Sequence, residues 1–231
     1  MDFEIEYSKM SDQHFEGVID AICEIFPPHE PMSKLQGISN EEFRDFATVI
    51  AKDALKNGIS HVATDTKTGK VVGYRISHDL IHDANPEMEK VIQNFPKIQP
   101  ILFLLDSLEK MYLENKKIEK GKVLYWFMVG VGQGENFFSL KKNKFITQKT
   151  EYNNKGIGKK LLERNIEAAK ENGFEYIICE ATGVISQHNA LKLGFEKKHS
   201  IVYKTYQYKG KNVFEKMETH IECMLMEKKI Y

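Results

Sequence analysis

The chain has 231 residues, a length typical of one or two domains, and 42% of them are hydrophobic, which is enough to build a substantial core. Its 33 basic and 33 acidic residues cancel, so the charge gives no support for nucleic-acid or membrane binding as the main task. No stretch rich in proline, glycine or serine marks a domain boundary, and we expect one domain over residues 1–231.

The beginning of the chain and its cysteines indicate a cytoplasmic protein. The first residues are acidic and lack the basic region and apolar core of a signal peptide, and no run approaches the ~18 apolar residues of a spanning helix. Cys23, Cys179 and Cys223 form no C-x-x-C pair, which favours free thiols over a disulfide framework or a zinc site. His78 and His82 are spaced i, i+4, but no third ligand follows, so we expect no metal.

The first half of the chain alternates helical and strand patterns. In order, the patterns predict a strand at 3–10, a helix at 11–26, a helix at 39–57, a hairpin at 60–79, helices at 88–95 and 101–117, and a strand at 122–131. Pro27, Pro28 and Pro31 are expected to end the first helix and to create a rigid turn that holds His29 and Glu30.

The second half is expected to contain a glycine turn and more strands. In order, the patterns predict a short strand at 144–149, a glycine turn with a helix at 150–173, a buried strand at 174–183, a short helix at 185–195, and strands at 199–210 and 220–229. Which of the segments 122–131 and 144–149 occupies the central sheet stays open. Helices that alternate with strands, followed by strands alone, predict a mixed α/β sheet.

The glycine turn "NNKGIGKK" opens a lysine-rich helix. A helix N-terminus exposes unpaired N–H groups with a partial positive charge, so glycines that let the backbone close around an anion form a phosphate cradle. A nucleotide P-loop is excluded because Asn153 stands at its first glycine position and Lys160 replaces its hydroxyl residue. A dinucleotide motif is excluded because Leu161 stands at its third glycine. Alone, the turn is equally typical of an ordinary helix entry.

The order of elements around this turn resembles the GNAT superfamily of N-acetyltransferases. Its pattern Arg/Gln-x-x-Gly-x-Gly/Ala, which binds the pyrophosphate of acetyl-CoA, is matched here by residues 153–158, with asparagine in the first position. The resemblance implies a mostly antiparallel mixed sheet flanked by helices, with acetyl-CoA as acetyl donor at a splayed strand pair. It also implies that backbone groups before the turn polarise the acetyl carbonyl. The implied coenzyme-binding residues are Thr147, Gln148, Lys149, Asn153, Asn154, Lys155, Gly156, Ile157, Gly158 and Lys159.

The segment "FPPHEPMS" and the C-terminal tail resemble the invertebrate arylalkylamine N-acetyltransferases of the dopamine type. This resemblance implies direct transfer from acetyl-CoA to a primary amine such as dopamine, tyramine, octopamine or serotonin. Glu30 would be the base, acting through water, and Ser186 with Thr182 would be the acid or would anchor a water. Many members of the superfamily place a tyrosine acid where this chain has Ala190.

Several alternatives stay open. Glu30 is also readable as a solvated turn residue, and Ser186 and Thr182 as helix caps. If the strand at 122–131 precedes the coenzyme turn, the residues after it are looped out. Cys179 invites a covalent mechanism, but a buried cysteine usually behaves as a small hydrophobe.

The substrate and the partners also remain open. An acidic groove would indicate polyamines, an aromatic pocket would indicate arylalkylamines, and protein amines are a further possibility. The alternative from another class is a degenerate acyl-CoA-binding protein without turnover. The only partner that we expect is a small-molecule amine, with no nucleic acid and no membrane, for a monomer or a weak dimer.

Overall fold

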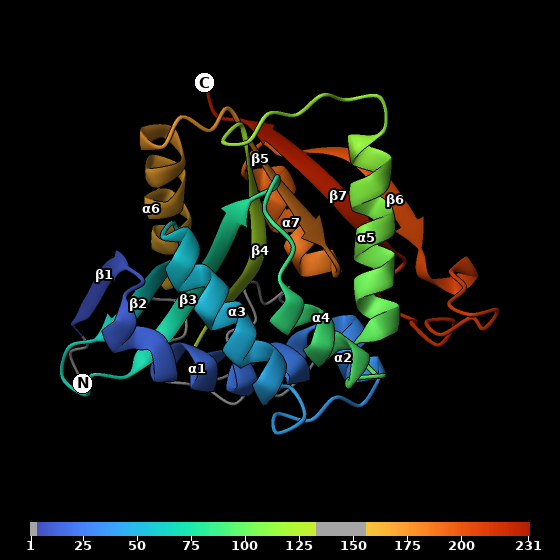
Figure 1. Ribbon diagram of the computed structural model, residues 1–231, viewed down its shortest axis with the longest axis horizontal. Coiled ribbons are helices and arrows are strands. Elements are labelled where there is room, and N and C mark those ends of the chain that lie inside the picture. The colour runs from blue at the N-terminus through green and yellow to red at the C-terminus, as the bar shows by residue number, and fades with distance from the viewer. Residues whose placement is uncertain (1–3, 133–155) are drawn as a thin grey trace, which may run out of the picture.

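One mixed sheet forms the centre of the molecule, and the computed structural model describes residues 4–132 and 156–231. Within these ranges the strands lie in the order β1-β2-β3-β4-β5-β7-β6 (Figure 1). They are β1 (Ile5–Lys9), β2 (His61–Asp65), β3 (Val71–Asp79), β4 (Val123–Val131), β5 (Tyr176–Ala181), β6 (Glu196–Val202) and β7 (Glu222–Lys229). Neighbouring strands are antiparallel, except for the parallel pair β4 and β5. The expected mixed, mostly antiparallel sheet is confirmed.

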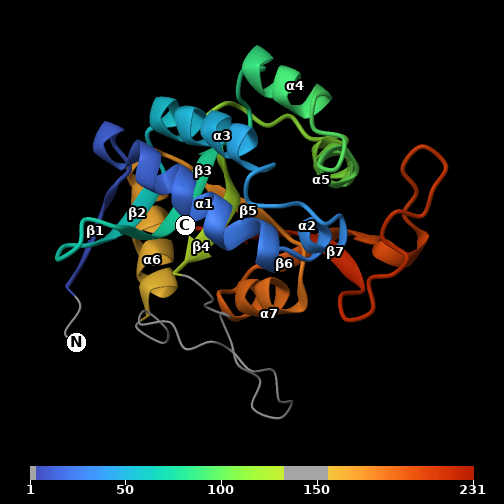
Figure 2. The same ribbon diagram turned by 90° about the horizontal axis from the view of Figure 1, so that it is seen from below.

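Helices cover both faces of this sheet (Figure 2). They are α1 (Phe15–His29), α2 (Pro31–Leu35), α3 (Arg44–Asn57), α4 (Pro86–Gln93), α5 (Gln99–Leu113), α6 (Ile157–Glu171) and α7 (Val184–Lys192). Helices α1 and α3 pack on β3 from one side, and α5 shares their hydrophobic cluster, which includes Phe43, Tyr74 and Leu104. Helices α6 and α7 cover the other side, over a smaller cluster with Leu124 and Phe195. The sheet therefore separates two apolar layers.

The prediction that prolines end the first helix is wrong. Helix α1 continues through Pro27 and Pro28 to His29, and the Glu30 N–H still donates to the Phe26 carbonyl at 2.8 Å. The two prolines lie in the last turn, where they deprive only the carbonyls of Cys23 and Glu24 of their usual i→i−4 donors. Pro31 is the first residue of α2, a position that tolerates a missing N–H. The expected rigid turn is thus reduced to Glu30 alone.

Most other elements are confirmed, with shifted ends. The hairpin turns at Gly69, whose φ of 71° lies in the left-handed region, and α3 ends at the left-handed Gly58. The strand expected at 199–210 is shorter, because β6 ends at Val202 and a 3-10 turn follows at Tyr203–Thr205. The strand expected at 144–149 lies outside the described residues. Over the described ranges, no helix has the length and apolar composition needed to cross a bilayer.

The parallel strands β4 and β5 pair over only part of their length. The last paired residues are Trp126 and Cys179, after which β4 continues along β3 to Val131 while β5 continues along β7. A bulge accompanies the separation, because β3 residues pair with Trp126 and Met128 but skip Phe127. The segment at 122–131 therefore occupies the central sheet and forms the splayed pair with β5.

Candidate active site

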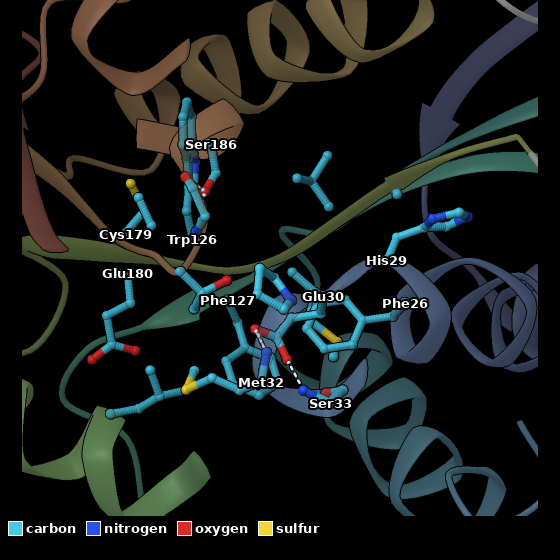
Figure 3. A pocket seen from close by; sticks show the side chains of 18 of the residues that line it. Phe26, His29, Glu30, Met32, Ser33, Trp126, Phe127, Cys179, Glu180 and Ser186 are labelled. Carbon is cyan, nitrogen blue, oxygen red and sulfur yellow. Dashed lines mark hydrogen bonds between the residues drawn. The ribbon is translucent and has the colours of Figure 1, made fainter. Parts of the chain in front are cut away.

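A cavity of about 300 Å³ lies where β4 and β5 separate. It passes from one face of the sheet to the other, because β4 side chains alternate between the two faces and both sets reach it. Figure 3 shows Trp126, Cys179 and Ser186 on one side of β4, and Glu30, Phe127 and Glu180 on the other. The cavity thus connects the α6 and α7 side with the α1 and α5 side.

Glu30 lies on this cavity and is largely buried. It is the N-cap of α2, where one carboxylate oxygen accepts from the Met32 N–H at 3.1 Å and the other from the Ser33 N–H at 2.6 Å (Figure 3). These hydrogen bonds fix the direction of the carboxylate while each oxygen keeps further acceptor sites. Glu30 is therefore neither solvated nor free to turn, in contrast to the solvated-turn interpretation.

The two predicted hydroxyl residues line the same cavity from the start of α7. The Ser186 hydroxyl donates to the Gly183 carbonyl at 2.8 Å and accepts from the Gly183 N–H at 3.1 Å, which gives α7 a capping interaction. Thr182 is not the cap, because Gly183 holds that position. Its carbonyl accepts from the Tyr203 hydroxyl at 2.6 Å, which holds the backbone beside the cavity.

Only part of the predicted coenzyme turn falls in the described residues. Gly156 is the N-cap of α6 with a left-handed φ of 73°, Ile157 and Gly158 are buried, and Lys159 is exposed beside Glu163. This α6 N-terminus lies in Figure 2 on the side of α7. The remaining predicted positions, Thr147, Gln148, Lys149, Asn153, Asn154 and Lys155, lie outside the described residues.

The edge of β4 that faces β5 offers a substitute for the expected strand at 147–149. From Met128 to Val131, β4 pairs with β3, and no described strand pairs with its other edge. Backbone N–H groups on such an edge can donate to a carbonyl in the cavity. This edge of β4 therefore presents backbone N–H groups to the cavity.

The α1 and α5 side of the cavity is mainly aromatic and aliphatic. Its lining residues include Phe26, Phe43, Phe46, Tyr125, Phe127, Ile98, Ile101, Leu102 and Leu105. The Tyr125 hydroxyl donates to a Glu180 carboxylate oxygen across β4 and β5. Burial, more than neighbouring acids, raises the pKa of Glu180 to about 8. An aromatic chamber with a second carboxyl group therefore faces Glu30.

Sequence reasoning missed Glu180 and Arg75, and both belong to the lining. Glu180 lies in the strand "YIICEA" and Arg75 in the strand "VVGYRIS". A charged residue within an otherwise apolar strand is unusual, and this pattern could have identified both as candidate site residues. It also missed His220, whose Nδ1 accepts from the Val184 N–H at 3.2 Å beside the cavity. Burial lowers the pKa of His220.

The cysteine on β5 is poorly suited to act as a nucleophile. Burial raises the pKa of Cys179 to about 12, which keeps the group a neutral thiol near pH 7. No described cluster of three or more histidine, cysteine, aspartate or glutamate side chains is arranged to hold a metal, and the rings of His78 and His82 lie 4.5 Å apart. A neutral, buried thiol of this kind is a poor nucleophile, so Cys179 is not suited to form a covalent intermediate.

No family model matches the sequence. The structure is similar to the C-terminal condensation domain of Ebony in complex with β-alanyl-dopamine, with a TM-score of 0.79 at 17% identity over 99% of this chain and 100% of that one. It is also similar to arylalkylamine N-acetyltransferase 2 from Aedes aegypti, with a TM-score of 0.76 at 20% identity over 99% and 100% of the two chains. A polyamine N-acetyltransferase from Drosophila melanogaster gives a TM-score of 0.68 at 16% identity over 98% and 100%. The chain therefore has the GNAT acetyltransferase fold that its glycine turn and its order of elements indicated.

Proposed function

We propose that this chain is a single-domain, cytoplasmic N-acetyltransferase that moves an acetyl group from acetyl-CoA to a primary amine, and that the amine is an arylalkylamine. One observation carries the proposal: a carboxylate and a hydroxyl, Glu30 and Ser186, line one cavity at the point where two parallel strands separate. The similarity to arylalkylamine N-acetyltransferases of known structure supports it.

Residues of the described chain fit an acyl-CoA donor on the α6 and α7 side. The Oδ1 atom of Asn189 is buried at the cavity and finds no hydrogen-bond partner in the described part of the chain, and the same holds for the Nε atom of Arg75. Buried polar atoms are nearly always paired, so both indicate a polar ligand. Asn189 would hold a pantetheine amide N–H, and the N-terminus of α6 at Gly156 and Ile157 would face the pyrophosphate. Acetyl-CoA would supply the activated acetyl group.

The free edge of β4 supplies the polarising donors. In the proposed reaction, backbone N–H groups between Phe127 and Val131 hold the carbonyl oxygen as negative charge develops on it. Such donors are already oriented by pairing of β4 with β3, so little reorganisation accompanies the reaction. Holding the amine and the thioester in one cavity lowers the entropic cost of bringing the two reactants together.

Glu30 is suited to remove the proton of the amine. An alkylammonium with a pKa of about 10 is protonated at neutral pH and has no lone pair with which to attack. A carboxylate whose direction is fixed by Met32 and Ser33 can accept this proton through one water. Ser186, beside the same cavity, would anchor that water or return a proton to the sulfur.

The lining favours an aryl substrate over a polyamine. The chamber on the α1 and α5 side is built from aromatic and aliphatic side chains, on which an aromatic ring packs. The second acid, Glu180, is paired with Tyr125 and is mostly protonated at neutral pH, so it offers a hydrogen bond more readily than a charge. Polyamines remain the second substrate class, because two carboxyl groups face the cavity and a polyamine N-acetyltransferase shares the fold.

Calorimetric titration with acetyl-CoA, followed by release of free thiol with arylalkylamines and polyamines, tests the proposal. We expect saturable binding and thiol release that is fastest with an arylalkylamine and is lost in Glu30→Gln. Binding without release by any amine would instead indicate a degenerate acyl-CoA-binding protein. Absence of binding would refute the proposal.

A further inference from the structure

Arg75 on β3 is a buried cation without an acidic partner among the described residues. Arg75 is 4% exposed, and among the described residues its Nε atom has no hydrogen-bond partner and no carboxylate lies within ion-pair distance. Removing an isolated charge from water costs several kcal/mol in a protein interior. Burial lowers the pKa of Arg75 to about 9, which still leaves the guanidinium charged at neutral pH. An unpaired buried cation on a cavity indicates an anion that arrives with a ligand.

The guanidinium lies at the point where β4 and β5 separate. Arg75 shares a face of β3 with Ser77, whose hydroxyl donates to Asn165 of α6 at 2.9 Å, so both side chains point to the α6 side. From there the guanidinium carbon stacks 3.8 Å from the centre of the Trp126 ring on β4. Its charge lowers the pKa of Cys179 on β5, against the larger effect of burial. The arginine thus reaches from β3 across β4 towards β5.

The position of Arg75 on the α6 and α7 side of the sheet indicates which ligand group supplies the anion. Glu30 and the aromatic chamber, where the amine would bind, lie on the opposite side of β4 from Trp126. The amine arrives as an ammonium ion, which the positive charge of Arg75 would repel, so Arg75 does not serve the amine. The acyl donor would lie on the α6 and α7 side, the side of Arg75. Its sulfur would acquire negative charge as the carbon–sulfur bond breaks. We infer that Arg75 is a further catalytic residue, whose guanidinium stabilises the thiolate that leaves the acyl donor. This inference rests on the proposed function.

The charge balance of the step is simple. The ammonium first gives one proton through water to Glu30, which passes it to the solvent. The neutral amine nitrogen then forms a bond to the carbonyl carbon and, as it becomes an amide nitrogen, gives a second proton through the same water to Glu30. The carbon–sulfur bond breaks, and its electron pair stays on sulfur as a thiolate beside the guanidinium. Arg75 gives up no proton, and the thiolate is protonated later from the solvent or by Ser186. Many members of the superfamily place a tyrosine acid where this chain has Ala190, and alanine has no proton to give to the thiolate. The positive charge of Arg75 would stabilise the thiolate in its place.

The test measures the acidity of the thiol of bound coenzyme A. Thiolate absorbance in the ultraviolet is followed against pH for the complex with coenzyme A, and the complex with desulfo-coenzyme A is subtracted to remove tyrosines and protein thiols. A free thiol has a pKa of about 8.5, and a cation within about 4–6 Å lowers a pKa by about 1–3 units. We expect a shift of at least about one unit in the wild type, its loss in Arg75→Met, and its retention in Arg164→Met. Arg164 is the matched control because it lies exposed on α6 and pairs with Glu167.

Each result decides a separate point. An unshifted thiol in bound wild type would overturn the inference while leaving the proposed acyl-CoA binding intact, and it requires no variant to fold. An equal shift in Arg75→Met, with desulfo-coenzyme A still bound, would assign the effect to backbone N–H groups and would also overturn it. Failure of the wild type to bind coenzyme A at all would refute the proposed function, and the inference with it.

Discussion

The hydroxyl of Tyr125 donates to the carboxyl group of Glu180, and this hydrogen bond joins β4 to β5 at the start of their separation. Glu180 is mostly buried, and the acids Glu109 and Asp106 of α5 add to the effect of burial on its pKa, which reaches about 8. The hydrogen bond from Tyr125 opposes these effects only in part. In the folded protein this carboxyl group therefore holds a proton that it would lose in the unfolded chain at neutral pH.

This difference makes stability depend on pH. The pKa of Glu180 is raised on folding from about 4.5 to about 8, so the folded state binds more protons between these values. The contribution of Glu180 to stability should be greatest below the lower value and should fall with rising pH towards about 8, by up to about 1.4 kcal/mol per pH unit. Glu180→Gln should flatten this fall, and urea unfolding at several pH values measures it. The exposed Glu171→Gln serves as the control, and parallel curves for wild type and Glu180→Gln would contradict the prediction.

Glu30→Gln should slow acetyl transfer by about 10²–10⁴-fold near neutral pH, which is the usual contribution of a positioned base. The loss should shrink as the pH approaches about 10, because the amine then loses its proton without help. Initial rates of thiol release against pH measure this. A capping residue alone would give a loss that is independent of pH, and this outcome would remove Glu30 from the mechanism. Glu41→Gln, which changes an exposed acid, should leave the profile unchanged.

The sequence predicted the order of elements better than it predicted their ends. Alternation and glycine signals located the hairpin at Gly69 and the end of α3 at Gly58, because both glycines have the left-handed backbone that other residues avoid. The proline rule failed at Pro27 and Pro28, because tertiary packing holds the last turn of α1 in helical form: Pro27 is buried there.

The candidate site was predictable where a local motif existed. Glu30 and Ser186 follow from short patterns, and the structure brings them to one cavity from distant parts of the chain. Arg75 and Glu180 have no motif, since their importance comes from burial and from the neighbours that the sheet gives them. A charged residue inside an apolar strand pattern indicates an unusual position, but the pattern does not predict which cavity the side chain lines.

Tyr74→Phe should stabilise the protein. The Tyr74 side chain is fully buried, and its hydroxyl has no hydrogen-bond partner over residues 4–132 and 156–231, so the folded state bears a desolvation cost of about 1–3 kcal/mol. Tyr112→Phe is the matched control with the opposite sign, because the Tyr112 hydroxyl donates to Glu227 at 2.5 Å. Chemical denaturation measures both changes. A loss of stability in Tyr74→Phe similar to that in Tyr112→Phe would contradict the prediction.

Phe127→Ala should reduce the preference for aryl substrates. Phe127 is the bulge residue of β4, it lines the aromatic chamber, and its ring lies edge-on to that of Tyr125 at 5.8 Å. A lost aromatic contact costs about 0.5–1.5 kcal/mol, so KM for phenylethylamine should rise about 2–13-fold while KM for putrescine should change little. Steady-state kinetics with both amines measures the difference. Phe103→Ala, which changes an exposed ring on α5, should alter neither constant. Equal losses for both amines would mean that Phe127 maintains the shape of β4 and does not contact the aryl ring, and the aryl preference would lose its support.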